Sequence, residues 1–253
     1  MHFMKIKRLT RRAIFMGMCA GILAAGLGRA ADGGKLSAVQ VDLGKLLNVR
    51  VVTTQTNGKV QLADHSLNRG SDSVLITKSA VEASKAGKLN PLSDSGYFAA
   101  NKEHPEVQLP YGTAGGGPQV HQSVDKTETY FIPVPTNHYA QMQLFFISAA
   151  GPTPISVTLQ YADGATKQRT TQVTDFYFLP KTDVKDWFVL AEDFGKVDLK
   201  AKMTESVHHY IHGYNLNPDA TKLLRQIEVT KENSGSVLNL FGATGKLADK
   251  GSR

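Results

Sequence analysis

The stretch "ISVTLQYADGATKQRTTQV", residues 155 to 173, carries the strongest local signal for secondary structure in the chain. From Ile155 to Tyr161 apolar and polar residues alternate, which is the pattern of a strand with one buried face. Asp163-Gly164 is typical of a two-residue type I′ turn, in which both residues have positive φ. The returning half is polar on both faces and is expected at or near a sheet edge. The stretch therefore predicts a β-hairpin.

Further strand-like runs surround this hairpin. In "YAQMQLFFISAA" (139–150), Met142, Leu144 and Phe146 share one face while Phe145 and Ile147 share the other, so this strand is expected to be covered on both sides. Other runs that favour strands are "LSAVQVDLGKLLNVRVVT" (36–53), "SVLITKSAV" (73–81), "TYFIPVP" (129–135), "RQIEVT" (225–230) and "SVLNLFGAT" (236–244). The segment "KDWFVLAEDFGK" (185–196) fits a strand or a short helix, and a helical turn is expected at Asn217 or Asp219.

Residues 84 to 129 differ in composition from the rest of the chain. They are rich in Gly, Pro, Asn and Ser and contain few apolar runs. We expect long loops with one or two strands here, packed over the body of the domain. Strand otherwise follows strand without regular intervening helices. The fold class is therefore all-β, a β-sandwich or barrel, with one domain at 36–245 and a polar tail at 246–253.

The N-terminus has the layout of a secretory signal peptide over residues 1–30. A basic segment precedes the apolar run "AIFMGMCAGILAAGLG", and small residues surround an expected cut after Ala30. The run is short for a membrane helix, so cleavage is favoured over a retained anchor. The paired arginines of "TRRAIF" (10–15) leave both the general and the twin-arginine export routes open. The mature protein is expected to be secreted or periplasmic, and any membrane contact would come only through an uncleaved leader.

Loss of this leader changes the charge of the protein. The 253-residue chain carries a net charge of +7, but residues 1–30 hold six basic residues and no acidic one. The mature chain would therefore have 23 basic and 22 acidic residues, a net charge of +1. A balance so close to neutral gives no indication of nucleic-acid binding. The only cysteine lies in the leader, which excludes internal disulfides and thiol chemistry from the mature protein.

The order of motifs is similar to that of a known family. "VDLGKLLNVR", "GYFAANKEHPEVQLPYG", the 139–168 region, "YIHGYNLNPDATKLLRQIEV" and "VLNLFGAT" follow one another along the chain. This order resembles the galactose-binding-like jelly-roll domains that accompany secreted glycoside hydrolases. The resemblance covers most of residues 38–243 and implies a jelly-roll β-sandwich that is non-catalytic and binds carbohydrate through loops at one end. In contrast to that family, we expect this domain to stand alone behind the leader, without a catalytic domain beside it.

Carbohydrate binding requires exposed aromatic rings, which stack on the apolar face of a sugar, together with amides and acids for its hydroxyls. The candidate residues of these types are Tyr97, Asn101, His104, Trp187, Tyr210 and Tyr214. Trp187 is the only tryptophan and lies among charged residues, so it is either a partly exposed ring or a core residue. Solvated loop acids are the favoured interpretation of the carboxylates near His104 and Trp187.

The run "HHYIHGYNLNP" (208–218) raises the question of a metal site. In a strand, His208, Tyr210 and His212 face one way while His209 and Ile211 face the other. Positions i and i+4 of a strand lie roughly 13 Å apart, too far for two histidines to share one ion. We expect an ordinary strand with half-exposed histidines, and neither a metal site nor any cofactor.

"GGGPQVHQS" (115–123) offers an enzymatic alternative. Gln119, Val120 and His121 match the "Q-[IV]-H" signature of jelly-roll polysaccharide lyases, in which the histidine acts as a base. The arginine-rich strand of those enzymes has no counterpart in the sequence, and no other catalytic motif occurs. The favoured function is an exported, non-catalytic protein that binds carbohydrate or assists polysaccharide processing. The alternatives are a jelly-roll polysaccharide lyase or hydrolase, and a structural or protein-interaction module of the cell envelope with a protein partner.

Overall fold

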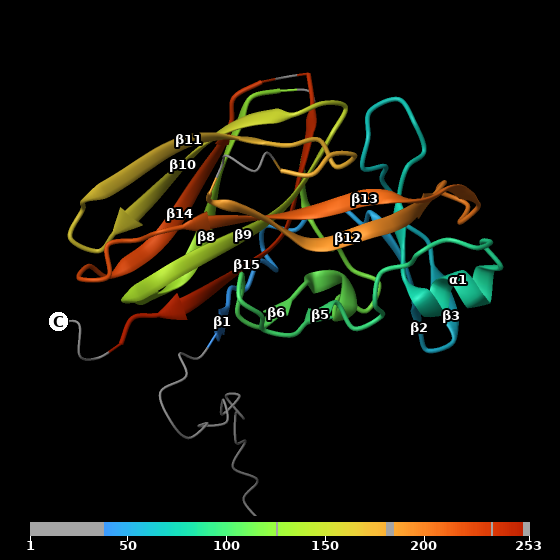
Figure 1. Cartoon of the computed structure of the whole chain (residues 1–253), viewed down its shortest axis with the longest axis horizontal. Helices are drawn as coiled ribbons and strands as arrows, with labels where there is room; N and C mark the ends of the chain where they lie inside the picture. Colours follow the sequence, from blue (N-terminus) through green and yellow to red (C-terminus); the bar gives the residue numbers. More distant parts are fainter. Residues whose placement is uncertain (1–37, 125, 181–184, 234, 250–253) are drawn as a thin grey trace, which may run out of the picture. The chain divides into compact units, whose positions relative to one another are not determined.

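The computed structural model describes residues 38–124, 126–180, 185–233 and 235–249. Two antiparallel sheets dominate the fold (Figure 1). The six-stranded sheet has the order β1 (Ala38–Gln40), β15 (Val237–Leu247), β9 (Tyr139–Ala149), β13 (Met203–Leu216) and β12 (Trp187–Val197), with β7 (His121–Ser123) also paired to β15. The four-stranded sheet has the order β11 (Thr166–Val173), β10 (Thr153–Tyr161), β14 (Leu224–Lys231) and β8 (Glu128–Asn137). The predicted all-β class is confirmed.

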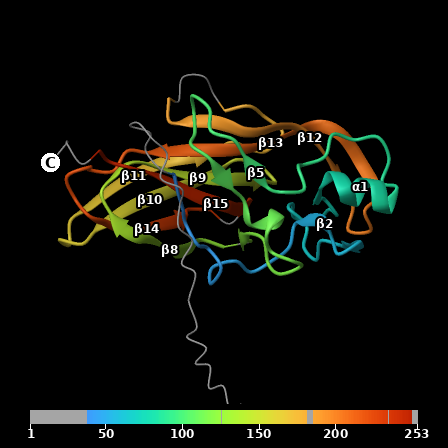
Figure 2. The same ribbon diagram turned by 90° about the horizontal axis from the view of Figure 1, so that it is seen from below.

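The main core lies between these two sheets, as in a β-sandwich. Met142, Leu144 and Phe146 of β9 belong to the same buried cluster as Ile155 and Val157 of β10. Figure 2 shows β8, β10, β11 and β14 as one layer beside β9, β13 and β15. Because alternate residues of a strand point to opposite faces, the alternation within 155–161 places its apolar side chains in this core.

A second core covers the opposite face of the six-stranded sheet. Phe145 and Ile147 of β9 pack there with Phe188, Ile211 and buried residues of the chain before β8. The expectation that β9 is covered on both faces is therefore correct. The covering chain includes β5 (Tyr97–Phe98), β6 (Val107–Gln108) and the 3-10 helix η1 (Pro110–Gly112), as expected for loops packed over the body of the domain.

A third, smaller cluster lies around β4 (Leu75–Ile76) and α1 (Lys78–Ser84), beside the C-terminal end of β12. Here the strand predicted over 73–81 is wrong in its second half, because the chain turns into α1 after Thr77. β4 pairs in parallel with β2 (Val52–Thr56), which forms a hairpin with β3 (Lys59–Gln61). The turn of that hairpin is Asn57-Gly58, and both residues have positive φ, 51° and 75°.

The hairpin predicted at 155–173 is present, with Thr153 to Gln160 paired to Val173 to Thr166. Its turn differs from the prediction. Gly164 N donates to Tyr161 O and Tyr161 N donates to Ala165 O, so the loop has three residues. Only Gly164 has positive φ, at 84°, which makes a type I turn closed by a glycine bulge rather than a type I′ turn.

Residues 187–197 form a strand, β12, and not a helix. The segment at 217–222 is a turn in which Asp219 Oδ1 accepts hydrogen bonds from both Thr221 N and Thr221 Oγ1, without a helix. β15 continues to Leu247, two residues into the segment assigned to the tail. The signal-peptide prediction falls on residues 1–30, outside the described residues, and within the described part no helix is long and apolar enough to span a membrane.

Candidate functional site

Two of the six candidate residues, Asn101 and Trp187, line one cleft of about 700 Å³. β12 is the last strand in the order of the six-stranded sheet, and its residues from Trp187 onward form one wall. The complete lining is Asn101, Glu103, Leu179, Pro180, Lys185, Trp187, Phe188, Val189, Leu190 and Glu192. We call this the β12 cleft. Its volume is that of a typical small-ligand site.

Trp187 is held in place by the sandwich core. Its ring stacks on Tyr214 with centroids 4.6 Å apart, and its Nε1 donates to Thr171 Oγ1 at 3.0 Å. The indole is only half-buried, since it packs against the core from its edge. Tyr214 covers one face of the ring, so a ligand in the cleft would meet the remaining exposed part.

Asn101 is fixed by a local hydrogen-bond network. Its Oδ1 accepts from Glu103 N at 2.8 Å and His104 N at 3.0 Å, and its Nδ2 lies 3.0 Å from His104 Nε2. Because His104 Nδ1 faces Pro105 O at 2.7 Å, that nitrogen carries the proton and Nε2 accepts from Asn101. The network orients the Asn101 amide at the cleft.

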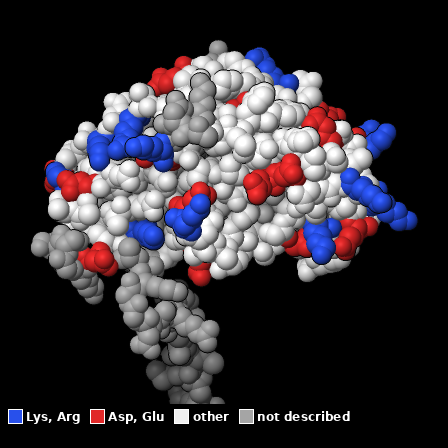
Figure 3. Space-filling model, viewed as in Figure 1, with Lys and Arg blue, Asp and Glu red and all other residues white. Residues whose placement is uncertain are grey.

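Three charged side chains complete the lining of the cleft. Glu103, Glu192 and Lys185 are exposed, and within the described part of the chain none of them forms an ion pair. Their charged groups are therefore available to a ligand's hydroxyls. Acidic and basic side chains are interspersed on the face in Figure 3, with wide uncharged areas between them.

The other four candidates do not line the cleft. His104 is 4% exposed and stacks on Phe188, so it orients Asn101 instead of meeting a ligand. Tyr214 is 2% exposed and belongs to the sandwich core. Their assignment as exposed contact residues is therefore wrong: the sequence shows an aromatic or imidazole ring but not its burial. Tyr97 is 44% exposed but lies on β5, outside the lining of the cleft. Tyr210 packs near His212 and is also outside that lining.

The histidine run is a strand, β13, yet its histidines are not half-exposed as expected. His209 and His212 are fully buried, whereas His208 is exposed at a bulge with φ of 83°. His209 Nδ1 donates to Phe194 O at 2.8 Å, and His212 Nε2 donates to Phe178 O at 3.0 Å. Burial lowers the pKa of His212 to about 4. Among the described residues no group of three or more His, Cys, Asp or Glu side chains is placed to hold a metal ion.

Sequence reasoning missed a buried charge network beside this strand. Lys196 Nζ bonds the Tyr177 hydroxyl and lies 2.9 Å from Glu205 Oε1, while Glu205 Oε2 lies 3.2 Å from His209 Nε2. The Lys196 side chain is 7% exposed and that of Glu205 is 41% exposed. Burial alone would lower the pKa of Lys196, but its bonds to Tyr177 and Glu205 outweigh burial and raise it. The alternation of residues along the strands did not predict this network, because β12 and β13 are bulged between these residues.

His121, the base of the lyase alternative, is not open to a polymer. It is 6% exposed, its Nδ1 lies 3.1 Å from Leu46 O, and its ring packs 4.3 Å from that of Tyr130. Tyr130 is itself buried in the sandwich core. The neighbouring Gln119 uses its side-chain amide to bond both Val52 N and Val52 O. In this chain, hydrogen bonding and packing therefore account for Gln119 and His121, two residues of the three-residue match.

Searches of protein-family models and of curated proteins found no match to this chain.

Proposed function

We propose that this chain is an exported, non-catalytic carbohydrate-binding protein and that the glycan binds in the β12 cleft. The main support for the proposal is that Asn101 and Trp187, although distant in sequence, line the same cleft. Glu103, Lys185 and Glu192 line it with them. A half-buried indole beside an oriented amide and free charges provides both the stacking surface and the polar contacts that sugars require.

Two further parts of the proposal rest on the sequence. Export rests on the leader-like residues 1–30, and the jelly-roll assignment rests on the resemblance to galactose-binding-like domains. The sandwich of two antiparallel sheets is compatible with that assignment. The near-neutral charge expected of the mature chain favours a neutral or mildly charged polysaccharide, since no strong field would attract an anionic polymer.

Affinity electrophoresis of the mature protein tests the proposal. The gels would contain xylan, mixed-linkage glucan, galactomannan, pectin or alginate. We expect retardation by at least one neutral polymer, no retardation of Trp187→Ala, and reduced retardation of Asn101→Ala. Phe131→Ala is the matched control, because Phe131 is 50% exposed but lies on β8, outside the cleft.

Each of the other outcomes identifies an alternative. Migration unchanged on every polymer would reject carbohydrate binding and favour an envelope interaction module. Release of unsaturated uronate products from alginate or pectin, absent in His121→Ala, would instead identify a lyase.

A further inference from the structure

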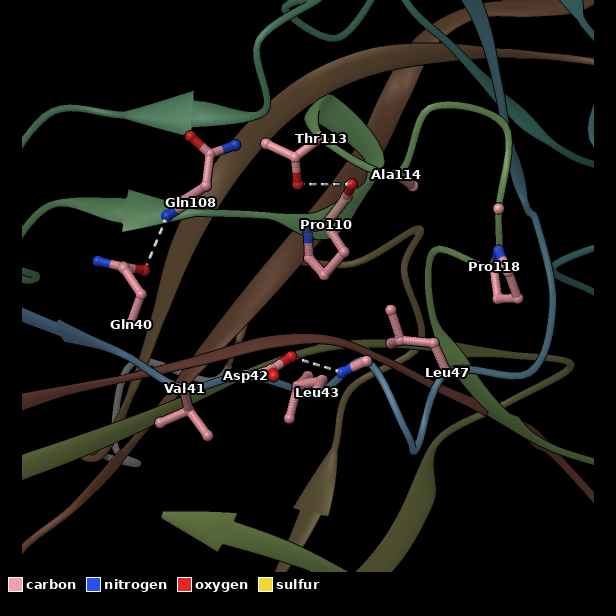
Figure 4. Close-up of a pocket in the computed structure, with 12 residues that line it drawn as sticks. Gln40, Val41, Asp42, Leu43, Leu47, Gln108, Pro110, Thr113, Ala114 and Pro118 are labelled. Carbon is pink, nitrogen blue, oxygen red and sulfur yellow. Dashed lines mark hydrogen bonds between the residues drawn. The ribbon is translucent and has the colours of Figure 1, made fainter. Parts of the chain in front are cut away.

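A second hollow, of about 460 Å³, does not share a lining residue with the β12 cleft. One wall is the segment Gln40–Gly44 with Leu47, and the other is the chain from Gln108 through Pro110 to Pro118 (Figure 4). Since Asp42 lines it, we call this the Asp42 hollow. Its size falls within the range of small-molecule sites.

Hydrogen bonds hold both walls of the Asp42 hollow in place. Gln40 Oε1 accepts from Gln108 N at 3.0 Å, and Gln40 Nε2 donates to Glu106 O at 2.6 Å, which ties the first wall to β6. Val41 N donates to Ala243 O of β15 at 3.1 Å. In the second wall, Ala114 N donates to Pro110 O and Gly117 N donates to Ala114 O, both at 2.8 Å. The hollow is therefore preformed.

The surface of the Asp42 hollow is mainly apolar, with a single charged residue. Val41, Leu43, Leu47, Pro110 and Pro118 supply apolar side chains, and Asp42 is the only ionisable residue in the lining. Gln40, Asp42 and Leu43 also line an adjoining hollow beside Phe131, and Lys45 belongs to that adjoining lining only. A ligand would therefore meet mainly apolar walls, the uncharged polar side chains of Gln40, Gln108 and Thr113, and one carboxylate.

Asp42 has hydrogen-bonding capacity left for a ligand. Its Oδ1 accepts from Gly44 N at 2.8 Å, as Figure 4 shows, and no ion pair to Asp42 occurs within the described residues. A carboxylate is an acceptor only, so its remaining oxygen calls for a donor, and most strongly for a cationic one. An apolar cavity with one free carboxylate is complementary to an apolar molecule that carries one ammonium group.

We propose that the Asp42 hollow binds a small organic amine, with its apolar body between Leu43, Leu47 and Pro110 and its ammonium group on Asp42. This site is separate from the carbohydrate proposal and does not depend on it. An amine, an alcohol and an acid with the same apolar body have similar shapes but different charges. A comparison of their affinities therefore isolates the role of the Asp42 charge.

The test is titration calorimetry of the protein with benzylamine, benzyl alcohol and benzoate at neutral pH. A charge-assisted hydrogen bond contributes more than a neutral one, so we expect benzylamine to bind about tenfold or more tightly than benzyl alcohol. Benzoate should not bind. Equal affinity for the three probes, or no binding of benzylamine, would overturn the proposal.

Three variants test whether the probes bind in the Asp42 hollow. Asp42→Asn keeps an acceptor for Gly44 N but removes the charge, so it should abolish the preference for benzylamine over benzyl alcohol. Asp72→Asn removes the same charge at an exposed position outside the lining and should leave that preference unchanged. Ala114→Leu, which fills the hollow, should weaken both probes and provides the test if Asp42→Asn does not fold. An unaltered preference in Asp42→Asn, or undiminished binding in Ala114→Leu, would contradict the assignment.

Discussion

His209 and His212 show how a polar residue can belong to the core of this protein. Each is fully buried and uses one ring nitrogen to donate to a backbone carbonyl. Burial lowers the pKa of both rings, and it also lowers that of His121. Burial therefore disfavours the charged form of these rings in the native structure.

This burial predicts a loss of stability in mild acid. His212 binds a proton near its ordinary pKa of 6.5 when unfolded but only near 4 when folded, so the unfolded chain holds more protons between these values. The free energy of unfolding should fall as the pH drops through this window, by about 3 kcal/mol for His212 alone. Urea unfolding at several pH values would measure this. His212→Gln should flatten the dependence, whereas His65→Gln, at an exposed position, should not; equal curves for all three would contradict the prediction.

The Lys196 network predicts an asymmetric effect of mutation. Glu205→Gln leaves the buried ammonium of Lys196 without its carboxylate and should cost about 3–5 kcal/mol. Lys196→Met leaves the half-exposed Glu205 carboxylate, which water can solvate, and should cost only about 1–2 kcal/mol. Denaturant unfolding of both variants provides the comparison. A larger loss for Lys196→Met would show that the network does not stabilise the protein through the buried cation.

At the scale of elements, strands were easier to predict from sequence than their turns and bulges. The alternation from Ile155 to Tyr161 identified β10 correctly, but Asp163-Gly164 fits both a two-residue and a three-residue loop. The pairing register decides between them, and the polar strand β11 does not reveal it. The bulges at Asp193 and His208 were also beyond prediction, because a bulge depends on two strands at once.

Alanine substitutions at two glycines distinguish the stability cost of backbone strain from that of steric overlap. Gly164 has positive φ and open space around it, so Gly164→Ala should cost about 1 kcal/mol through the left-handed conformation alone. Gly213 lies opposite Phe188 across β12 and β13, and a β-carbon there would overlap the Phe188 ring. Gly213→Ala should therefore cost about 3 kcal/mol or more. Thermal unfolding would rank the variants, and a smaller loss for Gly213→Ala would indicate that β12 can move away.

At the scale of the whole molecule, the sequence predicted the layers but only part of the site. The two-sided apolar pattern of β9 correctly indicated cores on both faces of its sheet. Residue type alone did not distinguish the half-buried Trp187 from the buried Tyr214, which occupy paired positions on neighbouring strands. Burial depends on which loops cover a strand, and the loops before β8 show no periodic pattern that would place them.

The fluorescence of Trp187 provides a direct test of the proposal that glycan binds beside this residue. Trp187 is the only tryptophan, so its emission reports on the β12 cleft alone. Titration with oligosaccharides of a polymer that retards the protein should give a saturable change in emission. Asn101→Ala should weaken this change and Phe131→Ala should preserve it. Binding detected by electrophoresis with no change in Trp187 emission would contradict the assignment of the cleft.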